Sequence, residues 1–440
     1  MKPEATKTVM SYANPTFRAI TVVCAAVAVG LTSIFTPATA QPKPEAVLKT
    51  YADIALAKYE DARTTAVELQ KAIKKLLQTP TEANLKAART AWLAARAPYQ
   101  QTEVYRFGNR IVDNWEGRVN AWPLDEGLID YVARDYGQTS EENPLYIANI
   151  IGNPKVRISG RDVDATRITK TLLSKTLHEA GGVEANVATG YHAIEFLLWG
   201  QDLNGTERGA GRRPASDYDT ANCSNGNCDR RAAYLSVATE LLIDDLDFII
   251  SQWKSNGPAR KALFEGGTAT GLTSIFSGLG SLSYGELAGE RMKLGLLLND
   301  PEEEHDCFSD NTHNSHFFNV VGIRNVYFGR YTRVDGSIVS GPSVSDLVAA
   351  ADKNIDTRVR GALDLTLARF TAMKRRAETV ESYDQMIGEA NDAGNAVVEA
   401  AVQSLIGQTK EFERAISVLK LKPVEFEGSD SLDQPGRVLQ

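Results

Sequence analysis

The chain has 440 residues, with 48 Lys or Arg and 56 Asp or Glu, so its formal net charge at pH 7 is −8. No cluster of basic residues is interleaved with aromatic residues, which excludes a nucleic-acid-binding surface of the usual kind. After the first forty residues, no run reaches the roughly 18 consecutive apolar residues that a membrane span needs. We therefore expect no transmembrane segment in the mature chain.

The first forty residues are typical of a cleavable signal peptide. Lys2, Lys7 and Arg18 form a basic segment, residues 19–35 are apolar, and an Ala-x-Ala cleavage site ends at Ala40. Cleavage after Ala40 would export the mature protein, and we therefore predict a periplasmic location.

Helical periodicity dominates the first half of the mature chain. Apolar residues recur at helical spacing from Glu45 to Leu77. Residues 79–82, Thr-Pro-Thr-Glu, then predict a capping box with proline at the first helical position, which opens a second helix running to about Arg106. Residues 107–165 are rich in glycine, asparagine, proline and aromatic residues, which indicates short helices and long loops.

The helical pattern continues to the end of the chain with few interruptions. An apolar helix is predicted to end at Gly200, and the sequence Ser-Asn-Gly-Pro at residues 255–258 ends the next helix. The remaining expected elements are a loop at 201–228, a helix at 229–253, a Gly/Ser-rich segment at 266–285, a helix at 286–298, an acidic loop at 299–310, a helix at 311–321, a turn at 334–337 and long helices from 344 to about 421.

The sequence thus predicts an all-α fold of two helical-bundle domains packed together. The break at Gly257 divides the chain into an N-terminal domain, residues 41–257, and a C-terminal domain, residues 258–425, followed by a flexible tail, residues 426–440. Both halves are rich in helices and similar in length, which leaves a structural duplication open, although no internal sequence repeat supports one.

Three cysteines remain after cleavage. Cys223 and Cys228 flank the turn sequence Ser-Asn-Gly-Asn, and an exported protein meets an oxidising environment. We predict a disulfide between them. Cys307 is then either a free buried thiol or the true partner of one of the other two.

His192 and Glu195 lie three residues apart in the apolar run from Gly190 to Gly200, so both face one side of the predicted helix. Gly190 would allow close approach by another helix, and Gly200 would end this one. A buried glutamate must be paired, protonated or bound to a metal. An imidazole with carboxylates suits iron, zinc or manganese. The alternative is a buried hydrogen bond that only stabilises the core.

A second polar stripe lies on the helix that precedes residue 107. The residues that share this face are Trp92, Arg96, Tyr99, Glu103 and Arg106. We expect Glu103 to be an additional metal ligand, with Arg96 or Arg106 as its hydrogen-bonding partner. A salt-bridge seam between two helices is the alternative.

The loop from Glu302 to His313 contains five carboxylates and two imidazoles, a density that fits a cation site. Asp310 is the expected ligand from this loop, and capping of the following helix is the alternative role for its carboxylate. Residues 302–304 are interpreted as a solvated charge run. His313 and His316 share a helical face that we expect to be simply polar.

The run from Gly190 to Gly200 resembles the G-x-H-x-x-E signature of the imelysin family. Four further segments are similar to imelysin sequences, and the resemblance extends from about residue 45 to residue 420. These segments are Trp92 to Gly108, Ala121 to Tyr131, Gly278 to Leu298 and Glu304 to Tyr331.

The resemblance implies an all-α, two-domain bundle with the signature at the domain interface, and a link to iron uptake or regulation. His192 and Glu195 occupy the signature positions. We therefore predict that a cation, iron first and zinc second, binds at His192, Glu195, Glu103 and Asp310. Arg96, Arg106 and Arg291 would hold these ligands through hydrogen bonds, and a membrane or periplasmic iron-uptake protein is the expected partner.

Two other functions remain open. The imelysin family is classed among metallopeptidases, so a metal-dependent peptidase at the same residues is one alternative, although H-E-x-x-H and H-x-x-E-H are both absent from the signature. The other alternative is a non-catalytic module that binds a small anion or a peptide near Arg96, Arg106 or Arg291.

Overall fold

Helices form most of the chain, which confirms the predicted all-α class. The structure is a computed structural model that describes residues 42–140 and 142–439. The predicted signal peptide with its cleavage site after Ala40 lies outside the described residues. In the described part of the chain, no helix is long and apolar enough to cross a membrane.

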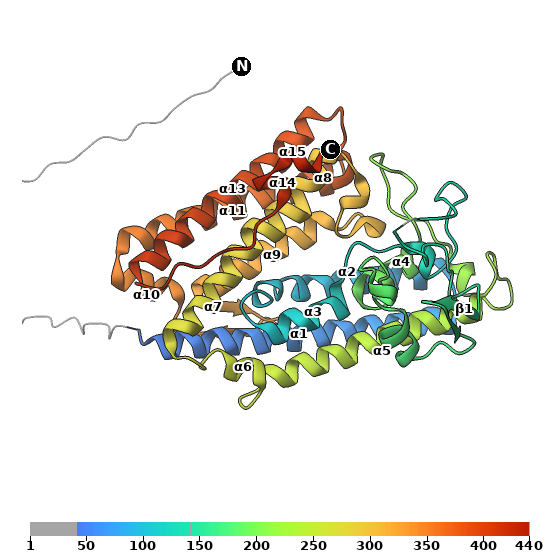
Figure 1. Cartoon of the computed structure of the whole chain (residues 1–440), viewed down its shortest axis with the longest axis horizontal. Coiled ribbons are helices and arrows are strands. Elements are labelled where there is room, and N and C mark those ends of the chain that lie inside the picture. The colour runs from blue at the N-terminus through green and yellow to red at the C-terminus, as the bar shows by residue number, and fades with distance from the viewer. Residues whose placement is uncertain (1–41, 141, 440) are drawn as a thin grey trace, which may run out of the picture. The chain divides into compact units, whose positions relative to one another are not determined.

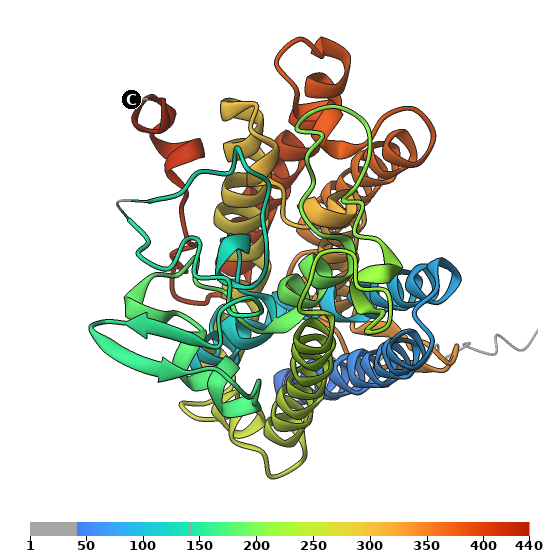
Figure 2. The same cartoon turned by 90° about the vertical axis from the view of Figure 1, so that its right-hand side faces the viewer.

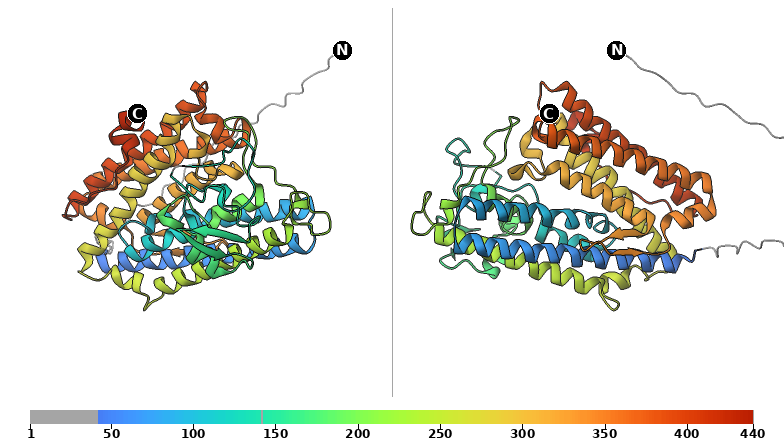
Figure 3. Two further views of the ribbon diagram at one scale, coloured as in Figure 1. Left: turned by 45° about the vertical axis from the view of Figure 1, so that its right-hand side comes forward. Right: turned by 180° about the vertical axis from the view of Figure 1, so that it is seen from behind.

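The helices of the first half pack around the segment that carries the signature. Helices α1 and α2 lie side by side, and α5 follows α1 along its other side (Figures 1 and 3). The shorter α4 contacts α2, α3 and α5. The bounds are α1 (Pro44–Gln78), α2 (Glu82–Gln100), α3 (Arg110–Asn120), α4 (Gly190–Trp199) and α5 (Cys228–Trp253).

The second half adds a further group of long helices, drawn in yellow to red in Figure 1. Helices α11 and α13 pack against each other, with α9 against α11 and the π-helix η6 against α13. The bounds are α6 (Pro258–Ala262), α7 (Thr268–Ser281), η6 (Leu282–Lys293), α8 (Leu294–Leu298), α9 (Thr312–Phe328), α10 (Val344–Ala351), α11 (Lys353–Thr379), α12 (Tyr383–Ile387), α13 (Asp392–Val418), α14 (Asp430–Asp433) and α15 (Pro435–Val438).

Short elements connect the helices. The two antiparallel hairpins pair Val156 with Val163 and Tyr331 with Val339, and the first of them is visible in Figure 2. The second confirms the predicted turn at 334–337, whereas the first was not predicted. The bounds are β1 (Lys155–Ile158), β2 (Arg161–Asp164), β3 (Arg330–Thr332), β4 (Ile338–Ser340), η1 (Glu103–Tyr105), η2 (Glu126–Leu128), η3 (Leu172–Leu177), η4 (Ala180–Gly182), η5 (Ala215–Tyr218), η7 (Pro301–Glu303) and η8 (Cys307–Ser309).

Both ends of α2 differ from the prediction. Thr81 is the N-cap and its side chain accepts a hydrogen bond from the backbone N–H of Asn84, so Pro80 precedes the cap instead of occupying the first helical position. The helix ends at Gln100 and not near Arg106. There the carbonyl of Tyr99 accepts hydrogen bonds from both the backbone N–H and the hydroxyl of Thr102 at 2.7 Å, so local contacts satisfy the end of the helix.

The Gly/Ser-rich segment at 266–285 is helical from Thr268 onward, although the predicted helix began only at residue 286. Helix α7 and η6 run through it without a break. The glycines allow close contacts, because a Cβ at Gly278 would lie 2.1 Å from the carbonyl oxygen of Val104. Glycine is unfavourable in an isolated helix, and here tight packing outweighs that cost.

The two groups of helices meet through α2 against α9 and α1 against α7. Residues 41–440 group as one compact unit. The domain boundary at Gly257 and the structural duplication stay predictions. Residues 426–433, part of the predicted tail, lie along η6, where Ser429 and Ser431 are buried.

Candidate metal centre

Helix α4 is buried along its whole length, including His192 and Glu195. Gly190 begins the helix with φ of +82°, and a Cβ there would lie 2.5 Å from the carbonyl oxygen of Val119 at the end of α3. Gly200 ends the helix with φ of +74°. Both glycines therefore have the roles that the sequence predicts, and they hold the signature in the interior.

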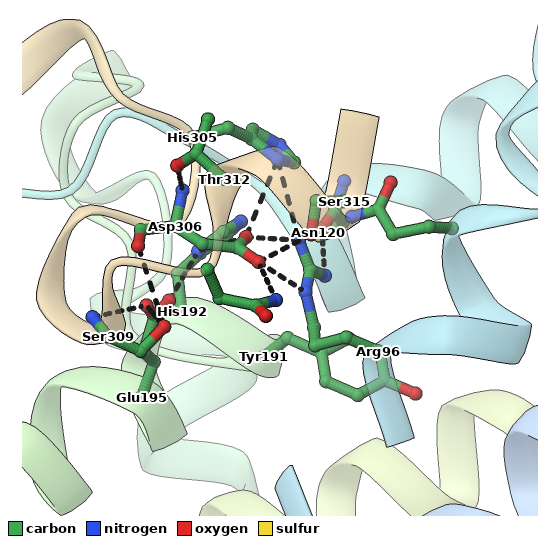
Figure 4. Close-up of polar contacts among 12 residues, drawn as sticks. Arg96, Asn120, Tyr191, His192, Glu195, His305, Asp306, Ser309, Thr312 and Ser315 are labelled. Carbon is green, nitrogen blue, oxygen red and sulfur yellow. Dashed lines mark hydrogen bonds and ion pairs between the residues drawn. The ribbon is translucent and has the colours of Figure 1, made fainter. Parts of the chain in front are cut away.

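His192 and Glu195 contact each other directly. The Nδ1 atom of His192 lies 3.1 Å from Oε2 of Glu195, and the other carboxylate oxygen accepts hydrogen bonds from the backbone N–H and the hydroxyl of Ser309 at 3.0 and 2.6 Å (Figure 4). Burial, followed by the nearby charge of Asp306, raises the pKa of Glu195. Burial without a directly paired cationic side chain therefore disfavours the ionised form of Glu195 relative to an exposed glutamate.

The loop before α9 brings two further ligand-type residues to this pair. His305 and Asp306 are fully buried, and the Asp306 carboxylate accepts hydrogen bonds from Arg96, Asn311 and Ser315. Burial raises the pKa of Asp306, but the guanidinium of Arg96 at 2.6 Å outweighs it and brings the pKa down to about 2. Asp306 is therefore an anion at neutral pH.

His192, His305 and Asp306 form a cluster whose ligand atoms all lie within 4.8 Å of one another. Oδ1 of Asp306 lies 4.0 Å from Nδ1 of His192 and 3.5 Å from Nδ1 of His305. Ligand atoms bound to one ion at 2.0–2.2 Å lie about 3 to 3.5 Å apart, so small shifts would suffice for coordination. Glu195 adds an oxygen beside His192, so the donor set is mixed nitrogen and oxygen.

Both imidazoles are held in the neutral form that binds metals. Burial and the charge of Arg96 lower the pKa of His192 to about 3, and burial and Arg291 lower the pKa of His305. Within the described ranges, Nε2 of His192 is buried and has no hydrogen-bond partner. The atom of His192 that faces Glu195 and Asp306 is Nδ1, which is therefore the coordinating nitrogen in this arrangement.

A pocket leads to His305 from the side of α3 and η6. It has a volume of about 410 Å³, and its lining includes Trp122, Glu290 and Glu303 besides His305. The ring of Trp122 packs edge-on against His305 at 5.7 Å between centroids. One of the candidate ligands can therefore be reached from a cavity, whereas His192 and Glu195 lie behind it.

Glu103 lies in a neighbouring network and not in the cluster around His192. Its Oε2 accepts hydrogen bonds from Arg291 at 2.7 Å and from Asn120 at 3.4 Å. Arg291 also pairs with Glu286, as does Arg106 at 3.1 Å. The partner of Glu103 is thus Arg291, and the predicted salt-bridge alternative describes its contacts better than direct ligation does.

Arg96, Arg106 and Arg291 all pair with carboxylates. Arg96 joins Asp306 to Asn120, whose amide donates to Glu116 at 3.0 Å, so the two networks are connected. Their positive charges are largely compensated within the protein, which removes much of the attraction for a small anion.

Asp310 points away from the signature. Its carboxylate groups with Asp202 and Asp384, and the residue takes a left-handed conformation with φ of +53°. The N-cap of α9 is Asn311, so the predicted capping role of Asp310 is wrong. Glu304 is buried as well, contrary to the solvated run predicted for 302–304, because the loop folds over α4 and α12.

His305 and Asp306 are the residues that sequence reasoning missed as individual ligands. Both lie in the acidic loop that the sequence predicted as a cation site from its density of carboxylates and imidazoles. The sequence did not show which residues of that loop face His192. A loop has no periodic face, and only the fold shows which of its side chains turn inward.

The cysteines follow the predicted pattern. Cys223 and Cys228 form a disulfide with Cα atoms 5.9 Å apart. Among the described residues Cys307 forms no disulfide, and burial raises the pKa of its thiol.

The fold and the site define an all-α protein with a buried His/Asp/Glu cluster. Comparison with known proteins agrees: the model of the Imelysin family (Peptidase_M75) matches residues 55–412. Iron-regulated protein A of Synechococcus elongatus is 36% identical over 84 residues, a match that spans 19% of this chain and 24% of that protein.

A solved structure extends the likeness to the fold. The crystal structure assigned to an iron-regulated protein A precursor of Parabacteroides distasonis has a TM-score of 0.61 and 16% identity, and the alignment covers 87% of this chain and 97% of that one. Because the family model covers most of the sequence, this chain belongs to the imelysin family, as the resemblance of the signature predicted.

Proposed function

We propose that the protein binds a metal ion, iron in the first place, at His192, His305 and Asp306, with Glu195 as a fourth ligand. The observation that carries the proposal is the buried cluster of these side chains, in which the measured separations between ligand atoms are 3.1 to 4.0 Å. Two neutral imidazoles with carboxylates suit iron, zinc or manganese.

The charge balance favours a cation over an anion. Asp306 and an ionised Glu195 carry two negative charges, and Arg96 supplies one positive charge. A cation that replaces the proton of Glu195 therefore meets a net negative site. Oδ1 of Asp306 already accepts a hydrogen bond from Arg96, and its second lone pair is free for coordination.

Iron is the first choice of metal because two relatives bear the name iron-regulated protein A. Zinc is the second choice, since the donor set does not separate the two metals. Export to the periplasm and delivery of iron to, or receipt from, a membrane or periplasmic partner complete the proposal.

Metal analysis of purified protein tests it. The wild-type protein, loaded anaerobically with Fe(II) or with Zn(II) and desalted, should retain a single equivalent, and His192→Ala and His305→Ala should each lose most of it. His178→Ala is the matched control, because His178 lies outside the cluster on the segment before α4. Unchanged metal content in both cluster variants, with native circular dichroism, would refute the site.

The peptidase alternative uses the same residues, and an assay of protein cleavage distinguishes it from metal binding alone. The family label names a peptidase, and zinc peptidases need about three ligands, a bound water and a general base. Chelator-sensitive cleavage of an unfolded protein that is lost in Glu195→Gln but retained in His178→Ala would favour this function. Metal binding without cleavage would favour the metal-binding function.

A further inference from the structure

A second group of acidic side chains gathers close to the candidate metal centre. Asp202 follows α4, Asp310 precedes α9 and Asp384 lies in α12, and one carboxylate oxygen from each lies within 4.8 Å of the others. The group contains no histidine. It therefore offers oxygen ligands only, unlike the cluster around His192.

Glu304 lies beside this acidic group, and one of its carboxylate oxygens has no hydrogen-bond partner among the described residues. It lines a small cavity with Asp202 and Asp384, and its residue is 1% exposed. One of its oxygens accepts from Thr312 at 3.1 Å, while within residues 42–140 and 142–439 the other has no hydrogen-bond partner. Asp384 is 2% exposed, and the hydroxyl of Ser382 and the backbone N–H of Gln385 lie close to its carboxylate. The unpaired oxygen of Glu304 is therefore available to an additional ligand in this cavity.

Little positive charge compensates this group: burial raises the pKa of Asp202, and the charge of Arg212 offsets this only in part. Burial and the charges of Asp384 and Asp202 raise the pKa of Asp310 to about 8. Glu304 and Asp384 are buried and Asp202 and Asp310 are half-buried, so protons or a bound cation are favoured over four free negative charges.

We propose that Asp202, Asp310 and Asp384, together with Glu304, bind a hard divalent cation of the calcium type. Calcium takes six to eight oxygen ligands in flexible geometry, and carboxylates from several segments suit it. Magnesium requires near-ideal octahedral geometry and usually keeps several waters, which fits a cavity of about 10 Å³ poorly. That volume holds one ion and excludes an organic ligand.

A cation at this site would link three segments that lie far apart in the sequence. The loop after α4 carries Asp202, the loop that supplies His305 and Asp306 carries Glu304 and Asp310, and α12 carries Asp384. Bound calcium would therefore raise the thermal stability of the folded chain, because an ion that binds only the native state shifts the folding equilibrium.

Thermal unfolding with calcium provides the test. After treatment with a chelator, the wild-type protein should melt at a higher temperature as CaCl2 is added, with a half-effect at about 10⁻⁴ to 10⁻³ M, the range of extracellular calcium sites. Asp384→Asn and Asp310→Asn should each raise the CaCl2 concentration of the half-effect at least tenfold. Isothermal titration with CaCl2 should rank the three proteins in the same order of affinity.

Asp392→Asn is the matched control, since Asp392 is exposed at the start of α13, and it should respond as the wild type does. His192→Ala should also retain the calcium response, so failure of the iron proposal leaves this one intact. The absence of any calcium response in the wild type, or an equal response in Asp384→Asn, would overturn it. A response to Fe(III) alone would overturn it too, because the assigned ligand class is then wrong.

Discussion

Replacing Gly190 by alanine should destabilise the protein strongly, because two costs combine at this residue. The backbone has φ of +82°, a conformation that costs an L-residue about 1–2 kcal/mol. The new Cβ would also lie 2.5 Å from the carbonyl oxygen of Val119 and 2.6 Å from its carbon. Overpacking of a buried site costs about 1–3 kcal/mol. The expected loss in the free energy of unfolding is therefore about 2–5 kcal/mol.

Gly336 separates the two costs. It lies in the turn between β3 and β4 with φ of +84°, and a Cβ there would meet nothing within 4 Å. Gly336→Ala should thus lose only the backbone contribution, about 1–2 kcal/mol. Urea unfolding of both variants, followed by circular dichroism, measures the difference. Equal losses would show that α4 can move away from Val119, and that the close approach does not position the signature.

Two further predictions concern buried ion pairs. Arg96→Met should cost about 3–5 kcal/mol in urea unfolding, because it leaves the Asp306 carboxylate buried without its main partner, and adding Asp306→Asn should recover part of that loss. Burial raises the pKa of Asp130, but Arg213 and Arg231 outweigh burial and hold this pKa below its ordinary value. The ionised Asp130 therefore contributes to folding stability above about pH 4, and this contribution is lost as the pH falls through the native pKa. Asp130→Asn should therefore be less stable than the wild type at pH 7, and the gap should close on acidification; a constant gap would contradict this assignment.

Regular amphipathic segments were predictable because burial leaves a periodic trace in the sequence. The run from Glu45 predicted α1 to within a residue or so at each end, and the apolar run after Gly190 predicted α4. The glycine-rich segment was not predictable as a helix. Its helical state depends on contacts with Val104 and Phe426, which lie far away in the chain and leave no local pattern.

The candidate site likewise contains residues that local periodicity predicts and residues that depend on distant contacts. His192 and Glu195 were predicted because a helix with known periodicity places them on one face. The contact of His192 with His305 and Asp306 joins residues more than a hundred positions apart and depends on how one irregular loop folds. Glu103 was predicted to be a ligand held by Arg96 or Arg106, but its salt bridge is with Arg291, which helical spacing alone could not show.

One loop, residues 304–311, supplies side chains to both candidate cation sites. Its left-handed residue, Asp310 with φ of +53°, allows adjacent side chains to diverge: Ser309 binds Glu195, while Asp310 joins the carboxylate group. Aspartate tolerates this conformation better than most residues do. The loop thereby sends His305 and Asp306 to the site with mixed nitrogen and oxygen ligands, and Glu304 and Asp310 to the carboxylate group. The mixed set suits iron or zinc and the all-oxygen set suits calcium, so each site would select its metal by the ligands it offers.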